Sequence, residues 1–421
     1  MPTPSSTRSR LAAVLFITQS FFSASTIAAF TLSPIIATTL SGSELYTGVP
    51  NTLTLVGRAL FAYPLGYMMD KLGRRLALGA GYGLSVIGGL LSVVAIINNS
   101  FLLFLVGAFA FGMARASGEQ SRYVAAEIYP LRERARMIGL IVFAGTIGAI
   151  GGPLLVAPST EWAVRMGQPA DAGPFWISIV FMVIGTLITL LFLRPDPREI
   201  GLAMAQEEAA RDVNSVENST SNRPMREIFA NPTVLLAMIA MVISYFVMAF
   251  LMVITPLHMS HHDHSTSAIS TVIMAHTLGM FGFSWLTGWL IDRWGRLNMI
   301  LVGGGILLVS CIVAPLSLHV PILGLALFLL GLGWNFGFVA GSSLLSDALA
   351  ARERGRAQGL SEAIVGITAG GASLSVGLVF QQGDYILVSI IGFGLTLIMM
   401  GAAVWLGQKG VAKKGIVPRN S

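Results

Sequence analysis

Charged side chains interrupt two of the long apolar segments in this 421-residue chain. Arg115, Glu119 and Arg122 are spaced four and three residues apart, so a helix would place them on one face. Arg58 lies about midway through another apolar segment. Because an ionisable group in an apolar environment is costly, these residues indicate a functional site. We expect Glu119 to bind a proton or a cation, and we expect the surplus positive charge to suit an anionic or amphiphilic substrate.

The same residues have a second interpretation. Three nearby arginines favour the ionised carboxylate, which opposes protonation of Glu119. The cluster would then be a static group of charges that joins two helices. Both interpretations stay open at the level of sequence.

Two sequence motifs occur twice in the chain. GYMMDKLGRR begins at Gly66, and GWLIDRWGR begins at Gly288, which is 222 residues later. RERARMIGL begins at Arg132, and RERGRAQGL begins at Arg352, which is 220 residues later. Two separate motifs at nearly one offset predict a parallel duplication of one structural unit.

Each copy of the first motif predicts a conformational latch. Its aspartate precedes a turn through glycine, so the carboxylate is placed to accept hydrogen bonds from the first amides of a neighbouring helix. The arginine after the turn is placed to reach an acid on another helix. A stop signal made of basic residues is the alternative, but it requires neither the aspartate nor the glycines. The first latch is Gly66, Asp70, Gly73, Arg74 and Glu127, and the second latch is Gly288, Asp292, Gly295, Arg296 and Asp347.

Composition indicates the class of protein. Hydrophobic residues make up 54% of the chain and charged residues only 11%, against roughly 25% charged in a soluble domain. So few charges cannot cover a water-facing globule, and we therefore expect an integral membrane protein. The low charge and the 47 glycines also argue against a coiled coil, a disordered chain or a nucleic-acid-binding protein. Cys311 is the single cysteine, which excludes an internal disulfide and a cysteine-based metal cluster.

Apolar segments long enough to cross a bilayer occur twelve times, and they are too long for barrel strands. We expect an all-α membrane protein with twelve transmembrane helices in two pseudo-symmetric six-helix bundles. The first segment is longer than a signal-peptide core, so we expect it to span the membrane as well. The expected spans lie at about 11–39, 46–68, 76–98, 101–128, 137–159, 174–193, 233–257, 267–291, 298–318, 321–349, 358–381 and 385–407.

Lysine and arginine concentrate in alternate loops between these segments. Short cytoplasmic loops retain basic residues, so the pattern predicts a multi-pass protein of the cell membrane with both termini in the cytoplasm. Arg165 is the one basic residue in an expected outer loop. We expect the long polar segment 194–232 to be a cytoplasmic linker between an N-terminal bundle, residues 1–193, and a C-terminal bundle, residues 233–421.

The twelve spans, the paired Gly-x-x-x-Asp-(Lys/Arg)-x-Gly-Arg loops and the arginine-rich loop after the fourth span resemble the major facilitator superfamily over essentially the whole chain. In that family, two six-helix bundles rock about a central site, and the loop motif helps to hold the outward-open arrangement. The resemblance implies this fold, and it gives that role to the aspartate, glycine and arginine of each latch. Arg115 resembles the buried fourth-helix arginine of proton-coupled facilitators, although Gly118 follows after three residues instead of four.

The fifth expected span contains Gly139, Gly148, Gly152 and Pro153. This pattern resembles the fifth-helix motif of proton-coupled drug antiporters in the same superfamily, and it implies export. The glycines expected after the proline are replaced by the run LLVAP. A helix-packing face would explain the glycines as well, so uptake stays as the alternative direction.

Two polar residues in the second half are further candidates for the transport site. His276 lies near the middle of the expected span 267–291, where an imidazole is suited to proton transfer, and a buried histidine with satisfied hydrogen bonds is the alternative. Asn335 occupies the place of Arg115 under the 220-residue offset. The two halves therefore differ in charge at this position, as a site for an asymmetric substrate requires.

A histidine-rich loop contains His258, His261, His262 and His264 together with Asp263. Imidazoles and a carboxylate can bind zinc, copper or nickel, or they can titrate near neutral pH. The spacing matches no closed metal site. We therefore expect no metal site, and the four histidines are kept as candidates for contact with a metal or a metal chelate against the alternative of a polar outer loop.

These observations predict a secondary transporter that works by alternating access and exports small organic or amphiphilic compounds in a proton-coupled reaction. Uptake, or transport of a metal or its chelate, is the alternative within this class, and a non-transporting membrane receptor or scaffold is the alternative from another class. The sequence has no phosphate-binding glycine loop, metalloprotease helix motif or serine nucleophile elbow, so we expect neither an enzyme nor a cofactor. The expected partners are a small-molecule substrate, protons and the lipid bilayer, and we expect a monomer.

Overall fold

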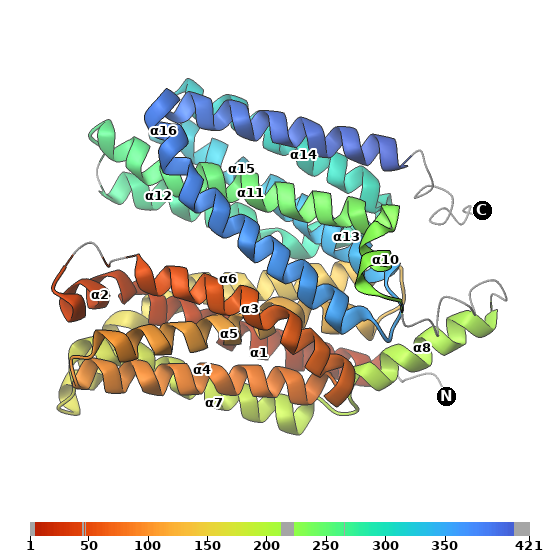
Figure 1. Cartoon of the computed structure of the whole chain (residues 1–421), viewed down its shortest axis with the longest axis horizontal. Coiled ribbons are helices and arrows are strands. Elements are labelled where there is room, and N and C mark those ends of the chain that lie inside the picture. Colours follow the sequence, from red (N-terminus) through yellow and green to blue (C-terminus); the bar gives the residue numbers. More distant parts are fainter. Residues whose placement is uncertain (1–4, 44–45, 47, 212–222, 265, 408–421) are drawn as a thin grey trace. The chain divides into compact units, whose positions relative to one another are not determined.

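Helices account for nearly all of the structure, and the part of the chain it describes contains no strand. The computed structural model describes residues 5–43, 46, 48–211, 223–264 and 266–407. Figure 1 shows the arrangement of the helices. In chain order they are α1 (Ser5–Thr31), α2 (Ser33–Ser41), α3 (Val49–Leu72), α4 (Arg74–Ile97), α5 (Phe101–Glu127), α6 (Arg134–Arg165), η2 (Ala170–Ala172), α7 (Gly173–Phe192), α8 (Pro197–Arg211), α10 (Met225–Ala230), α11 (Pro232–His261), α12 (Thr266–Thr277), η4 (Leu278–Gly282), α13 (Ser284–Trp294), α14 (Arg296–Val313), η5 (Ala314–Leu316), α15 (Val320–Ala348) and α16 (Arg354–Leu406).

Nine of the described helices are long and apolar enough to cross a membrane. This count differs from the expected twelve for three reasons. The last two expected spans, 358–381 and 385–407, are counted together as α16, although the backbone is non-helical at Gly383 and Asp384, where one helix ends and the next begins. The expected span 267–291 is divided by the π-helical turn η4 into α12 and α13. The helix α3 has the length of a span but contains Arg58, Asp70 and Lys71, which lower its mean hydropathy. Among the described residues, each of the twelve expected segments therefore lies mainly in helix.

The chain forms two compact units. The first unit contains Met1–Pro130, Leu140–Asn222 and Ala350–Ile367, and the second contains Leu131–Gly139, Arg223–Leu349 and Thr368–Ser421. The beginning of α6 thus packs within the second unit, and the beginning of α16 packs within the first. The division of the chain at 194–232 stays a prediction. Within that segment the structure describes α8 and α10, and residues 212–222 lie outside the described part.

In the first unit, α5 packs against both α3 and α4, and α7 packs against α4 and α1. Aromatic rings fill the space between the helices: Phe111 and Phe175 lie 6.3 Å apart between ring centroids in an edge-on arrangement, and Phe104 contacts Phe175 in the same way at 5.8 Å. Such pairs contribute about 0.5–1.5 kcal/mol beyond the area they bury. They fix the position of α5, which contains Arg115, Glu119 and Arg122.

In the second unit, α15 is the central helix and packs against α11, α12 and α14. Trp334 stacks on Phe338 along α15, and Tyr245 of α11 lies edge-on to both rings. In both units many large apolar side chains remain exposed, such as Leu102, Leu154 and Leu374. A surface of this kind is unsuited to water and matches a lipid environment.

Candidate functional site

The residues of the first latch lie together at the end of α3. Asp70 accepts hydrogen bonds from the amides of Gly355 (3.0 Å) and Arg356 (2.9 Å), which belong to the first turn of α16. A carboxylate at this position satisfies amides that have no partner within their own helix and interacts favourably with the helix dipole. Arg74 donates through Nε (2.8 Å) and Nη2 (3.0 Å) to the two carboxylate oxygens of Glu127. This two-point contact joins the start of α4 to the end of α5.

The second latch has the same geometry in the second unit. Asp292 accepts from the amides of Arg136 (2.8 Å) and Ala135 (3.3 Å), in the first turn of α6. Arg296 donates through Nε to Asp347 at 3.0 Å, and its Nη2 lies 3.0 Å from Asp292. Each latch therefore combines an aspartate at a helix N-terminus with an arginine–carboxylate pair, as the repeated motif predicts. The role of these contacts as a conformational latch stays a prediction.

The glycines of both motifs are required by this geometry. Gly73 and Gly295 have φ of +92°, a backbone conformation that residues with a side chain rarely adopt. Gly66 faces the backbone of Gly355, and a Cβ atom at Gly66 would lie 2.1 Å from that carbonyl oxygen. Gly288 faces Ala135 in the same way, with a distance of 2.4 Å. The helix that carries each aspartate thus lies in backbone contact with the helix whose amides the aspartate binds.

Burial perturbs both latch carboxylates. Burial raises the pKa of Asp70 above its ordinary value, although the charge of Arg74 and the amides of Arg356 and Gly355 oppose this effect. Burial likewise raises the pKa of Asp292 from 3.8 to about 6, against the opposing effects of Arg296 and of the amides of Arg136 and Ala135. The neighbouring carboxylate of Asp347 adds to the rise. Asp292 therefore titrates near the pH of a mildly acidic compartment.

This pKa predicts a pH-dependent difference between the wild-type protein and Asp292→Asn. The folded protein binds a proton at Asp292 more tightly than the unfolded chain, so the free energy of unfolding contributed by this group is largest below pH 3.8 and falls until pH 6. Lowering the pH from 7 to 5 should therefore raise the melting temperature of the wild type relative to Asp292→Asn by roughly 2 °C or more. Thermal unfolding in detergent at both pH values measures this difference, and an unchanged difference would contradict the assignment.

A network of buried charges lies in the middle of the first unit. Glu362, in the part of α16 that packs within this unit, is fully buried. Its carboxylate lies 3.3 Å from Nη2 of Arg58, pairs with Nη2 of Arg122, and accepts a hydrogen bond from the hydroxyl of Tyr123 at 3.2 Å. Arg58 and Arg122 are themselves buried. Two arginines from α3 and α5 therefore share one fully buried carboxylate.

Glu119 forms the second carboxylate of this network. Its oxygens lie 3.3 Å from Arg122 and 3.6 Å from Arg58, and Arg115 approaches at 3.8 Å. The side chain of Glu119 is 24% exposed and that of Arg115 is 33% exposed, whereas Glu362 is 0% exposed. The structure thus brings together all four residues that the sequence analysis proposed for this site. Three arginines face two carboxylates, and the cluster has one surplus positive charge.

The glycines of the fifth expected span lie on packing faces of α6. A Cβ atom at Gly139 would lie 2.1 Å from the carbonyl oxygen of Ser284, within the second unit. Gly148 faces Ser23, and Gly152 faces Ile27, both on α1 within the first unit. Pro153 lies within α6, and its side chain is outside the described part of the chain. These close contacts show that the glycines pack against neighbouring helices, and the direction of transport that the motif implies stays a prediction.

His276 and Asn335 lie in the second unit, on α12 and α15. His276 is buried and its Nδ1 lies 2.9 Å from the carbonyl oxygen of Leu327. Its Nε2 has no hydrogen-bond partner among the described residues. The amide nitrogen of Asn335 donates to the carbonyl oxygen of Met280 and to the hydroxyl of Ser284. Asn335 of α15 therefore contacts η4 and α13, whereas His276 of α12 contacts α15.

The histidine-rich loop has contacts other than metal coordination. His258 stacks on Tyr385 with ring centroids 4.5 Å apart, and its Nδ1 lies 3.5 Å from Asp384. Nδ1 of His262 lies 2.8 Å from the carbonyl oxygen of His258. Of the residues that the structure describes, no three or more with His, Cys, Asp or Glu side chains are arranged to hold a metal ion. That His258, His261, His262 and His264 contact a metal or its chelate stays a prediction.

Two residues have structural roles that the sequence analysis does not predict. Glu362 is a carboxylate within the apolar span expected at 358–381, and this is the signal from which its role could have been found. The carboxylate of Asp196 accepts hydrogen bonds from the amides of Arg74 (3.0 Å) and Arg75 (3.1 Å) in the first turn of α4. Its position shortly after the end of α7, between two prolines, gave no indication of this contact.

The fold and the repeated sites define a class: a multi-pass helical membrane protein whose two units contain equivalent latches and whose helices contain buried charges. The family model of the Major Facilitator Superfamily matches residues 14–373 and 237–421. The chain belongs to this superfamily, whose members are secondary transporters.

Comparisons with individual proteins agree with this assignment. The chain is 32% identical to an uncharacterized MFS-type transporter, YddS of Bacillus subtilis (strain 168), over 93% of this chain and 89% of the relative. It is 28% identical to the riboflavin transporter RfnT of Brucella anthropi, over 95% of this chain and 96% of the relative. Among solved structures, the human organic anion transporter MFSD10 matches with a TM-score of 0.76 and 14% identity, covering 95% of this chain and 100% of that protein, which shows the shared fold.

Proposed function

We propose that this protein is a proton-coupled secondary transporter that exports small organic or amphiphilic compounds by alternating access. The observation that carries the proposal is the position of Glu119. This carboxylate lies within the apolar helix α5, contacts three arginines, and is partly exposed while its neighbours Arg58, Arg122 and Glu362 are buried. A titratable group in a membrane-spanning helix that a solute can reach is suited to exchange a proton for a substrate.

The charge of the substrate determines how it would couple to the proton. A compound with a positive or hydrogen-bond-donating group competes with the proton for Glu119, so that proton entry releases the compound and exchange results. An anion would instead bind Arg115, which is the most exposed arginine of the cluster and has the longest contact with Glu119. Protonation of Glu119 would leave the arginines free for such an anion, and cotransport would result. The surplus positive charge of the cluster favours this second mode as the alternative function.

The latches support alternating access. Asp70 and Asp292 each bind the first amides of a helix that begins within the same unit, and backbone contact at Gly66 or Gly288 brings the partners close. These contacts depend on a few hydrogen bonds and one charge pair, so they can form in one state of the cycle and break in the other. Proton entry supplies the free energy, of which the electrical part is roughly 2.3 kcal/mol per charge per 100 mV.

The similarity to the riboflavin transporter RfnT supports an organic compound as the substrate. A panel of organic cations, organic anions and flavins, scored by thermal shift at two pH values, would select candidates for flux measurements. Inside-out vesicles with an imposed proton gradient would then give the direction of transport. A protein that folds normally but shows no counterflow with any binding compound would be a receptor or scaffold.

The Glu119→Gln variant tests the coupling role. Glutamine keeps the size and hydrogen-bonding capacity of the side chain but cannot exchange a proton, so proton-driven flux should fall at least tenfold while counterflow without a gradient persists. Flux in proteoliposomes with and without a pH gradient measures both quantities. The matched control is Glu161→Gln, because Glu161 is 70% exposed and pairs only with Arg165 among described residues.

If Glu119→Gln retains full proton-dependent flux at normal protein levels, Glu119 is not the coupling group. The static interpretation would then hold, in which the cluster only joins α3, α5 and α16. The same assay on His276→Gln would show whether the second candidate takes this role.

A further inference from the structure

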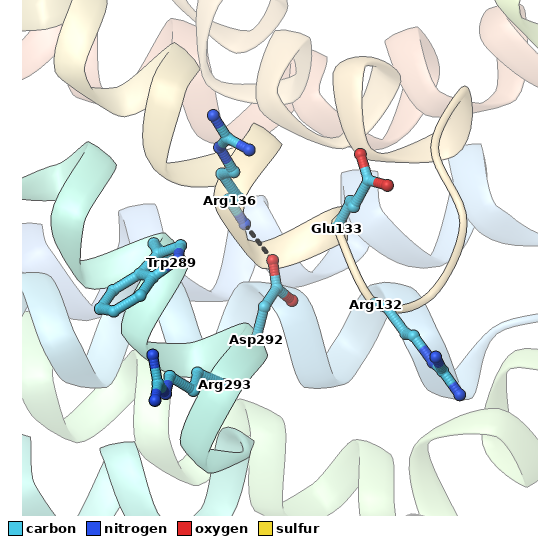
Figure 2. Close-up of a pocket in the computed structure, with 6 residues that line it drawn as sticks. All are labelled: Arg132, Glu133, Arg136, Trp289, Asp292 and Arg293. Atoms are coloured by element: carbon cyan, nitrogen blue, oxygen red, sulfur yellow. Dashed lines mark hydrogen bonds between the residues drawn. The ribbon is translucent and has the colours of Figure 1, made fainter. Parts of the chain in front are cut away.

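A charged cavity of about 330 Å³ lies beside the second latch, where the beginning of α6 meets α13. Figure 2 shows its lining: Trp289, Arg136 and Arg293 lie to one side of Asp292, and Glu133 and Arg132 lie to the other. All six residues belong to the second unit. Since one water occupies roughly 30 Å³ in the liquid, the cavity has room for a phosphodiester and its nearest substituent.

The positive charge of this cavity is not neutralised. Asp292 is already engaged by two amides and by Arg296. Arg132, Arg136 and Arg293 are exposed, and none of them forms an ion pair with a carboxylate among the described residues. Three arginines therefore line a space in which, among the lining residues, Glu133 alone offers an unengaged negative charge. An anion that enters would be held by several charge-assisted hydrogen bonds.

Exposed tryptophans lie next to these arginines. The guanidinium of Arg293 lies 5.3 Å from the ring centroid of Trp289, and that of Arg136 lies 5.9 Å from Trp285. Trp285, Trp289 and Trp294 are all exposed along α13. Tryptophan concentrates at the boundary between lipid and water, and α13 forms the end of an expected span on the side predicted to be cytoplasmic. The cavity therefore lies at the depth of lipid headgroups.

We propose that this cavity binds the phosphate headgroup of an anionic phospholipid from the cytoplasmic leaflet. Basic pockets beside membrane helices recognise such headgroups, and arginine matches phosphate oxygens with two parallel hydrogen bonds. A choline headgroup would add a positive charge among three arginines, so it should bind much less well. This inference concerns a site separate from Glu119 and does not depend on the transported compound.

Native mass spectrometry of the purified protein in detergent tests the proposal. With phosphatidylglycerol and phosphatidylcholine of identical acyl chains, we expect phosphatidylglycerol to bind at least tenfold more tightly. Arg136→Gln/Arg293→Gln should reduce this preference at least fivefold. The matched control is Lys71→Gln/Arg75→Gln, which removes two positive charges from the connection between α3 and α4 in the first unit and should leave the preference for phosphatidylglycerol unchanged.

Further measurements keep the test decisive. Arg293→Lys retains the charge but loses the two-point contact, so it should reduce the preference partly, and it provides a readout if the double variant fails to fold. Glycerol phosphate and inorganic phosphate at millimolar concentration are added as competitors, to test whether the cavity binds a phosphate group that is not part of a lipid. Equal binding of both lipids would overturn the proposal, and so would an effect of the control variant as large as that of the double variant. Full competition by the soluble phosphates would also overturn it, because it would show that the site binds free phosphate.

Discussion

Replacing Glu362 by glutamine is expected to destabilise the first unit by roughly 3–5 kcal/mol, because it removes one partner from a buried ion pair. The side chain of Glu362 is 0% exposed and is the carboxylate closest to both Arg58 and Arg122. Without its charge, Glu119 would be the nearest remaining carboxylate of both buried guanidinium groups among the described residues, and its contacts are 3.3 Å and longer. Glutamine is nearly isosteric, so the loss reports on charge and not on packing.

Thermal unfolding in detergent, with the yield of monodisperse protein as a second readout, measures the effect. Glu161→Gln is the matched control, since the same exchange at a side chain that is 70% exposed should change the melting temperature by less than about 1 °C. A double variant, Arg122→Gln/Glu362→Gln, should recover part of the lost stability because it removes one of the two uncompensated cations. If Glu362→Gln is as stable as the control, the charges of this network do not stabilise the fold.

The latches show what a single sequence can predict about a site. Their residues lie within one short motif, and the partners Glu127 and Asp347 have nearly the same offset, 220 residues, as the motif itself. A contact that is repeated by gene duplication provides its own consistency check, because each partner must be present twice. The structure places Arg74 against Glu127 and Arg296 against Asp347, in the arrangement that this repeat predicts.

The contacts of Glu362 could not be predicted in the same way. Its partners Arg58 and Arg122 lie 304 and 240 residues earlier, and the pairing has no counterpart at the 220-residue offset in the sequence. It depends on the beginning of α16 packing within the first unit, which is a tertiary property. For a similar reason the composition predicted the spans, including the break between the last two at Gly383 and Asp384, but not the π-helical turn in η4, since a local backbone change leaves the apolar pattern intact.

Introducing one methyl group at Gly66 is expected to abolish transport without unfolding the protein. In Gly66→Ala the new Cβ atom would lie 2.1 Å from the carbonyl oxygen of Gly355, a backbone atom that cannot rotate away. The beginning of α16 would have to move from α3, which lengthens the hydrogen bonds from Gly355 and Arg356 to Asp70. Alanine favours a helix over glycine by roughly 1 kcal/mol. A loss of function in Gly66→Ala would therefore not result from a less stable α3 helix.

Gly83→Ala is the matched control, since Gly83 lies in α4 and an added methyl group there would meet no neighbouring atom within 4 Å. A cysteine introduced at Ala357, which is fully buried, reports on the contact when the native Cys311 is replaced by serine. Gly66→Ala should increase thiol labelling at position 357 and reduce flux at least tenfold, whereas Gly83→Ala should change neither.

The two readouts of Gly66→Ala separate a latch from ordinary helix packing. Equal labelling and flux in Gly66→Ala and Gly83→Ala would show that the contact between α3 and α16 is not required for the cycle. Increased labelling with normal flux would show that the contact forms but does not control transport. Only increased labelling together with lost flux supports a latch, because a packing defect alone would lower the melting temperature and leave the flux per folded molecule unchanged.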